Sequence, residues 1–188
     1  LVSPFTVRAK MMLRKLWGHE NKLDWDDSIP EHLKREWITF FEELFELEKV
    51  RIPRCIKPTM SVEAPELVLF SDASKEAYGA AAYVRWSLTD GTFAARLIAS
   101  KNRIAPIKTV DIVRLELAGA LLSKRLRTFI QKESRYAFRA IYDIVDSEII
   151  QAMISNESYA FSTYAANRIG EIQQETEASE WYSAPGNL

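Results

Sequence analysis

The spacing of apolar residues changes near residue 66 and divides the chain into two parts. Before this point apolar side chains recur every three or four residues, a spacing that is typical of amphipathic helices. The clearest of these stripes consists of Leu33, Trp37, Phe41, Leu44 and Leu47. After this point short apolar runs alternate with helical segments, and three prolines in residues 51–65 favour an extended connector between the parts. We therefore predict a helical segment over residues 1–60 and a second domain over residues 61–188.

Polar residues and prolines mark the expected starts of two N-terminal helices. Ser3 is predicted to cap the first helix, with Pro4 at its first helical position. Ser28 and Glu31 have the three-residue spacing of a capping box at the start of the second helix. The acidic stretch DWDD, residues 24–27, fits a capped and solvated turn between the helices better than a cation site.

The second part has the pattern of a mixed sheet. The sequence predicts strands over residues 66–74, 77–88, 92–104, 136–147 and 179–185. It predicts helices over residues 110–132, 147–155 and 162–175, and the TDG stretch at 89–91 is a hairpin signal. Three strands joined as hairpins, followed by helix, strand, helices and strand, predict an α/β fold with a mixed sheet flanked by helices.

Three carboxylates occupy unusual places in this pattern. Asp72 ends the first strand, where a charge costs free energy unless something binds it. Glu116 interrupts the apolar residues of the predicted long helix, and Asp146 ends the fourth strand. Carboxylates that converge from strand ends and a neighbouring helix repel one another, and their oxygens are ligands that suit Mg²⁺ or Mn²⁺. Two such ions can promote hydrolysis of a phosphodiester.

Each of these acids also has a plainer interpretation when it is taken alone. A glutamate on a helix is usually solvated, and Asp146 together with Ser147 could cap the next helix. Asp111 and Asp143 are competing acids in the same region. In an alternating strand Asp143 points away from the face of Asp146, so we interpret Asp143 as structural.

Composition and charge narrow the function classes. The formal net charge is −1, so the chain is not a general polycation, yet ten basic and only three acidic residues lie between residues 101 and 139. A solvated helix face and a groove for a phosphate backbone explain this local charge equally well. The single cysteine, Cys55, excludes an internal disulfide and a cysteine-based zinc site, and it fits a reduced setting.

Several stretches resemble one family in the same order along the chain. FSDASKEAYGAAAYVR, LIASKNRIAPIKTVDIVRLELAGALL, DIVDSEII and YAANRIGEI resemble the ribonuclease H region of BEL/Pao-type LTR retrotransposon polyproteins. The opening LVSPFTVRAKMMLRKLW, together with LDWDDSIPEHLKREW and VRIPRC, resembles the segment between the polymerase and ribonuclease H in the same polyproteins. The resemblance covers nearly the whole chain.

This resemblance implies a ribonuclease H fold, with a five-stranded mixed sheet and helices on both faces. It implies cleavage of the RNA strand of an RNA–DNA hybrid during reverse transcription, with Mg²⁺ or Mn²⁺ as the cofactor. The three acids of the family fall on Asp72, Glu116 and Asp146, the residues that the strand and helix pattern had already singled out. The basic residues expected to bind the hybrid backbone are Lys101, Arg103 and Arg114.

The resemblance also implies partners and a location. We expect a reverse transcriptase region upstream and an integrase region downstream in the same polyprotein, and no membrane partner. The expected location is intracellular, in cytoplasmic particles or in the nucleus. We expect residues 1–60 to be the connection segment that follows the polymerase.

Three departures from the family pattern limit the expected activity. Ser183 stands where the family has a histidine that aids metal turnover or product release, and Val113 stands where a proline is usual. The fourth acid of the family would lie beyond Leu188, so we expect a fragment that cleaves weakly or not at all alone. The alternative function is a catalytically decayed or co-opted remnant that binds nucleic acid or a protein partner, or a scaffold that supports the polymerase.

Overall fold

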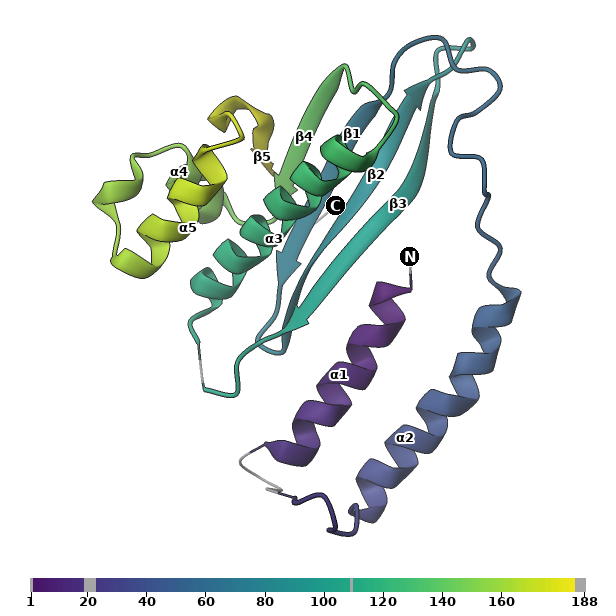
Figure 1. Cartoon of the computed structure of the whole chain (residues 1–188), viewed down its shortest axis with the longest axis vertical. Coiled ribbons are helices and arrows are strands. Elements are labelled where there is room, and N and C mark those ends of the chain that lie inside the picture. Colours follow the sequence, from purple (N-terminus) through teal and green to yellow (C-terminus); the bar gives the residue numbers. More distant parts are fainter. Residues whose placement is uncertain (1, 19–22, 109, 185–188) are drawn as a thin grey trace.

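The computed structural model describes residues 2–18, 23–108 and 110–184, and a five-stranded sheet forms its centre (Figure 1). The strands are β1 (Glu66–Ala73), β2 (Ala77–Ser87), β3 (Phe93–Ile104), β4 (Ala140–Val145) and β5 (Trp181–Ser183). Their order across the sheet is β3-β2-β1-β4-β5. β1, β2 and β3 pair antiparallel, whereas β1, β4 and β5 pair parallel. The predicted mixed five-stranded α/β sheet is therefore confirmed.

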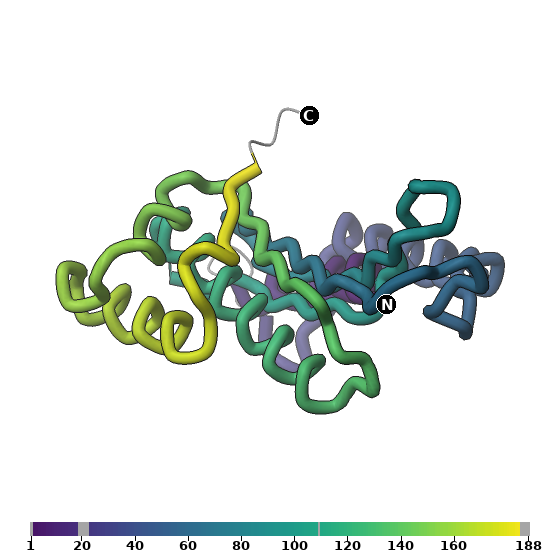
Figure 2. Tube along the Cα trace, turned by 90° about the horizontal axis from the view of Figure 1, so that it is seen from above, coloured from purple at the N-terminus to yellow at the C-terminus, as the bar shows by residue number. Residues whose placement is uncertain are grey.

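Helices pack on one face of this sheet. They are α3 (Ile112–Glu133), α4 (Glu148–Ile154) and α5 (Thr163–Gln173). Leu67 and Leu69 alternate along β1 toward α3, whose Leu122, Leu126 and Ile130 complete one apolar cluster. A second apolar cluster joins α3, α4 and α5 beside β4 and β5. Figure 2 shows the course of the chain from above. The helical spacing read from the sequence thus corresponds to a buried face.

The N-terminal helices α1 (Ser3–Trp17) and α2 (Glu31–Leu44) pack antiparallel to each other, with α1 next to β3 (Figure 1). The Phe5 ring of α1 stacks on the Phe40 ring of α2, with their centroids 4.6 Å apart. The predicted cap at Ser3 is wrong, because the helix begins one residue earlier and Val2 is the N-cap. The Ser3 hydroxyl instead donates to the Ser100 carbonyl of β3 at 3.1 Å.

The predicted start of α2 is also wrong. No side chain caps this helix, and Pro30 occupies the N-cap position. The Pro30 carbonyl accepts hydrogen bonds from the amides of Leu33 and Lys34, both at 3.0 Å, so the helix begins two residues beyond the place where the Ser28 hydroxyl could serve it. The acidic stretch before it forms the expected turn, in which the Asp24 amide donates to the Asp27 carboxylate at 2.7 Å.

Apolar surface remains open on α2 and on the second face of the sheet. The predicted stripe on α2 is only partly buried, since Phe41 is 52% and Leu44 is 41% exposed. On the sheet face opposite α3, Phe70 is 43% exposed and cavities of about 590 and 290 Å³ lie over β1, β2 and β4. Asp72 lies two residues after Phe70 on β1 and therefore on the same face of the sheet, so this open face leads to the predicted acids.

Within the described ranges no helix is both long enough and apolar enough to span a lipid bilayer.

Candidate active site

Asp72 and Asp146 lie side by side at the ends of two neighbouring parallel strands. Asp72 is the next-to-last residue of the central strand β1, and Asp146 directly follows β4. The register pairs Ser71 with Val145, so the residue after each of these two is an aspartate. Because parallel strands present their carboxyl ends at the same edge, the two carboxylates meet there. The site therefore follows from strand order as much as from residue type.

When Asp146 is protonated, its carboxyl group donates a hydrogen bond to the Asp72 carboxylate, and the two groups then share one proton. Partial burial, a hydrogen bond to the Asp72 carboxyl group and the negative charges of Asp72 and Glu116 raise the pKa of Asp146 to about 6. The Asp72 carboxylate also has a hydrogen bond to its neighbour in the chain, since its Oδ1 atom accepts one from the Ala73 amide at 2.6 Å. Two carboxylates in this arrangement attract a cation or a proton, because either one removes their mutual repulsion.

Glu116 approaches the pair from α3. It lies in the second turn of the helix and is half-buried. One turn later, Gly119 packs on the Asp72 backbone, and a Cβ atom at this glycine would lie only 3.3 Å from the Asp72 carbonyl oxygen. The absence of a side chain at Gly119 lets α3 approach the strand end closely enough for the Glu116 charge to act on Asp146.

The donor set fits a hard divalent cation, although the three acids do not form a closed cluster. Within residues 2–18, 23–108 and 110–184, no group of three or more His, Cys, Asp or Glu side chains is arranged to hold a metal ion. Asp72 and Asp146 lie within hydrogen-bonding reach of each other, whereas Glu116 acts on Asp146 through its charge. A cation that replaces the shared proton would have two carboxylates in place and Glu116 on the neighbouring helix as a third oxygen donor.

The competing acids have structural roles. Asp143 is completely buried on the α3 side of β4, where it accepts hydrogen bonds from the Ser123 hydroxyl and the Arg127 guanidinium, both at 2.9 Å. Asp111 is the N-cap of α3, and its side chain accepts the Val113 amide. Asp146 does not cap α4, because Ser147 is the N-cap residue and no side chain serves that end. The structural interpretation of Asp143 is confirmed.

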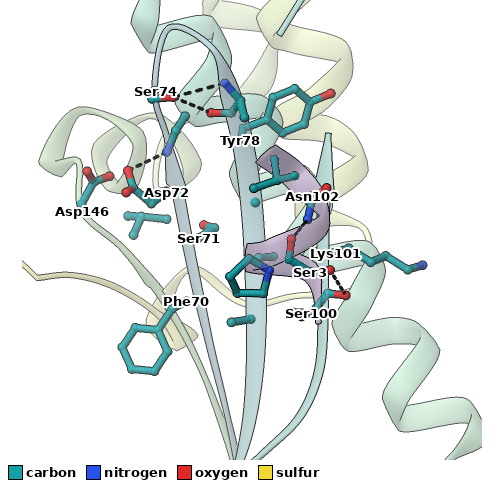
Figure 3. Close-up of a pocket in the computed structure, with 18 of the residues that line it drawn as sticks. Ser3, Phe70, Ser71, Asp72, Ser74, Tyr78, Ser100, Lys101, Asn102 and Asp146 are labelled. Atoms are coloured by element: carbon teal, nitrogen blue, oxygen red, sulfur yellow. Dashed lines mark hydrogen bonds between the residues drawn. The ribbon is translucent and has the colours of Figure 1, made fainter. Parts of the chain in front are cut away.

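A groove leads from the acidic pair to the N-terminal helix. Figure 3 shows Asp72 and Asp146 at one end of a cavity of about 530 Å³, with Ser3 of α1 on the opposite side. Phe70 lies below the acids along β1. The two carboxylates are therefore open to a ligand from the sheet face opposite α3, on which α1 packs beside β3, and the first turn of α1 forms one wall of this approach.

Two of the three predicted basic residues share a cavity of about 420 Å³ between α3, α5 and the end of β3. Arg103 and Arg114 line it together with Arg125, Arg168 and Tyr164. The Arg114 and Arg168 guanidinium carbons lie 5.1 and 3.5 Å from the centroid of the Tyr164 ring. Lys101 lies outside this cavity, and its Nζ atom is 5.4 Å from the centroid of the Phe129 ring.

The arginines of this cavity differ in whether a carboxylate neutralises their charge. Arg125 is neutralised by a bidentate pair with Glu171, at 2.7 and 2.8 Å. In the part of the chain that the structure describes, Arg103 and Arg114 have no carboxylate partner. Arg168 and Tyr164 escaped the sequence analysis, although their spacing of four residues on one helix was a usable signal. The cavity therefore presents uncompensated positive charge beside the helix that carries Glu116.

Ser183 lies close to the acidic pair. It pairs with Val145, the residue before Asp146, and is half-buried on β5. Its position at the site edge agrees with the place at which the family resemblance implies a histidine. Its hydroxyl cannot titrate near neutral pH as an imidazole does. The other expected departures at the end of the chain, up to Leu188, lie outside the described residues.

Comparisons with known proteins give one family and several distant structures. A family model described as the Pao retrotransposon-like RNaseH-like domain matches residues 1–147, a range that contains all three predicted acids. Among solved structures, the N-terminal RNase H domain of Rv2228c from Mycobacterium tuberculosis, fused to maltose-binding protein, is 12% identical with a TM-score of 0.42. The alignment covers 65% of this chain and 84% of that chain.

Two further structures are similar at the same level. RNase H1 from Halobacterium salinarum is 11% identical with a TM-score of 0.37, over 65% of this chain and 86% of that chain. The foamy viral protease–reverse transcriptase, solved in complex with dsDNA, is 12% identical with a TM-score of 0.41, over 100% of this chain and 40% of that chain. No curated protein sequence matches the chain significantly.

Proposed function

Because the chain belongs to the family of Pao retrotransposon-like RNaseH-like domains, we propose that it hydrolyses the RNA strand of RNA–DNA hybrids with the help of Mg²⁺ or Mn²⁺. The observation that carries this proposal is the contact between Asp72 and Asp146 at the ends of two central parallel strands, with the Glu116 charge acting on Asp146. A pair of touching carboxylates at an exposed sheet edge is unfavourable in an apo protein and favourable around a divalent cation.

Asp72, Glu116 and Asp146 would hold the cation or cations. Bound there, the ions would activate a water for attack on the scissile phosphate and stabilise the leaving 3′ oxygen. The proton between Asp72 and Asp146 must leave first, and the raised pKa of Asp146 sets this requirement near pH 6. Discrimination between hybrid and DNA duplex would come from minor-groove shape and 2′-hydroxyl contacts rather than from base sequence.

The cavity between α3 and α5 would bind the phosphate backbone. Among the described residues Arg103 and Arg114 lack carboxylate partners, and Arg114 belongs to the helix that carries Glu116, so a phosphate could neutralise them. Lys101 would add a more distant positive charge from the same strand. Arg168, whose guanidinium lies against the Tyr164 ring, would also bind the phosphate backbone of the hybrid.

The place of the chain in a polyprotein is part of the same proposal. Residues 1–60 would be the connection segment after a reverse transcriptase, residues 61–188 the nuclease domain, and an integrase region would follow. The location would be intracellular, in cytoplasmic particles or in the nucleus. The division near residue 60 stays a prediction, since the family match runs through it without a break.

A cleavage assay with three duplexes of one sequence tests the proposed function. A longer chain that includes the fourth acid expected from the family resemblance is incubated in excess with a labelled RNA–DNA hybrid, a DNA duplex or an RNA duplex, in Mg²⁺ or Mn²⁺. We expect cleavage of the RNA strand of the hybrid only, and its loss when EDTA removes the cation. Hybrid binding without cleavage in either cation would contradict the enzyme and favour the decayed or co-opted remnant, for which Ser183 is the specific indication.

Removal of Arg103 or Arg114 is expected to weaken hybrid binding by a similar factor for all sequences. Each Arg→Ala substitution removes one phosphate contact, so the slope of log affinity against log salt concentration should fall by about one. Fluorescence anisotropy of a labelled hybrid over a salt series measures both effects. The matched control is Arg96→Ala, since Arg96 is an exposed arginine on the same strand far from the cavity. An equal loss in this control would contradict the assignment.

A further inference from the structure

The turn that follows the strand of Asp72 and the loop that leads to the helix of Glu116 meet at one end of the sheet. Residues 74–76 form the turn that follows Asp72, and residues 105–108 begin the connection from β3 to the helix of Glu116. The Ala105 amide donates to the Glu76 carbonyl at 2.7 Å and joins the two loops. This junction therefore joins the turn after Asp72 to the start of the connection that leads to α3.

Arg14 of α1 spans the same junction from outside. Its Nη2 atom donates to the Pro106 carbonyl at 2.9 Å, and its Nη1 atom donates to the Glu76 carbonyl at 3.3 Å. One acceptor belongs to each loop, and both are backbone atoms. Because a guanidinium is planar and holds its N–H groups in fixed directions, binding both carbonyls fixes their separation.

The helix that carries Arg14 is itself anchored to the sheet. The Asn102 side chain donates to the Ser3 carbonyl at 2.7 Å and accepts a hydrogen bond from Lys10 at 2.8 Å. Figure 1 shows that the C-terminal half of α1 extends toward the end of the sheet where β1 stops and α3 begins. Arg14 thus projects from a held helix, so its contacts can restrain the junction.

We propose that Arg14 is a positioning residue for the acidic site, and that the N-terminal helix α1 thereby belongs to the active site. Arg14 holds the turn after Asp72 against the loop that leads to Glu116, which keeps α3 and its glutamate next to the acidic pair. The cation-binding consequence rests on the proposed function, whereas the restraint of the loops does not.

Arg14→Ala in the full chain tests this proposal, with Arg8→Ala as the matched control. Arg8 is an arginine on the same helix, but its ion pair is with Glu43 of α2 and touches neither loop. In Arg14→Ala we expect the Ala105 amide to exchange with solvent several times faster and Mn²⁺ to bind at least about threefold more weakly. In Arg8→Ala both quantities should stay at the wild-type value. Amide exchange by NMR and calorimetric titration with Mn²⁺ are the measurements.

Arg14→Lys separates positioning from general packing. A lysine can reach one carbonyl but cannot bridge two with a planar fork, so its effects should be intermediate. Unchanged Ala105 exchange in Arg14→Ala would overturn the restraint, and faster exchange with unchanged Mn²⁺ affinity would overturn the positioning role. If the wild-type chain binds no Mn²⁺, the proposed function fails, while the exchange comparison still decides whether Arg14 restrains the loops.

Discussion

Asp72→Asn is expected to abolish hybrid cleavage and to weaken Mn²⁺ binding by more than about 100-fold, since even outer partners of metal ligands contribute 10- to 100-fold. Asparagine has nearly the same shape as aspartate, so the strand end should keep its structure. What changes is the charge, because one of the two touching carboxylates is lost. Calorimetric titration with Mn²⁺ and the hybrid assay measure the two effects. Full activity in this variant would remove Asp72 from the metal site.

The pH dependence of cation binding provides the control for this variant. In the wild type, Mn²⁺ affinity should rise with pH up to about 6 and then level off, because Asp146 must lose its proton. In Asp72→Asn the partner charge is gone, so the pKa of Asp146 should fall toward its ordinary value. Asp111→Asn is the matched control, since Asp111 is an exposed acid that only caps α3. It should bind Mn²⁺ like the wild type at every pH.

The raised pKa of Asp146 also makes the stability of the cation-free protein depend on pH. The folded state holds the shared proton more tightly than the unfolded chain, so the favourable contribution is complete below the ordinary pKa of an aspartate. It is lost as the pH rises through about 6, where Asp146 ionises beside Asp72. A divalent cation should restore this loss at neutral pH, because it takes the place of the proton.

The acidic pair could be predicted from the sequence because its cause is local. An aspartate after a buried strand is conspicuous wherever that strand lies, and both Asp72 and Asp146 have this pattern. Their contact depends on the parallel pairing of β1 with β4, which follows from the predicted order of strands and helices. Gly119 completes the site by a close approach that no spacing of residues reveals.

The missed features depend on contacts between distant segments. Arg168 meets Arg114 only because α5 packs against α3, and Arg14 binds backbone carbonyls, which exist at every residue. The capping box at Ser28 failed because Pro30 provides the first helical carbonyl. The apolar stripe on α2 is only partly buried in the structure, since amphipathicity shows which face of a helix is apolar and not what covers it.

Arg127→Met is expected to lower the free energy of unfolding by about 3–5 kcal/mol, the cost of removing one partner of a buried ion pair. The Arg127 side chain is 5% exposed and the Asp143 side chain is completely buried. Arg127 also binds both oxygens of the Glu180 carboxylate, at 2.8 and 2.7 Å, and so ties α3 to β4 and to the turn before β5. Without it, the Ser123 hydroxyl is the one partner that Asp143 keeps among residues 2–18, 23–108 and 110–184.

Chemical denaturation at several pH values separates a lost charge from lost packing. Burial already raises the pKa of Asp143 and Arg127 opposes that rise, so without the arginine the aspartate takes up a proton more readily. This proton stabilises the folded variant at low pH and is lost as the pH rises, so the loss of unfolding free energy in Arg127→Met should be smallest near pH 4.

Arg125→Met is the matched control, two residues along α3, where the half-exposed pair with Glu171 should contribute less than about 1 kcal/mol. Equal stability of Arg127→Met and Arg125→Met would show that the buried contacts of Arg127 with Asp143 and Glu180 stabilise the fold no more than the half-exposed Arg125 pair does. If the combined Arg127→Met and Asp143→Leu variant recovers most of the loss, the unpaired buried charge is its cause.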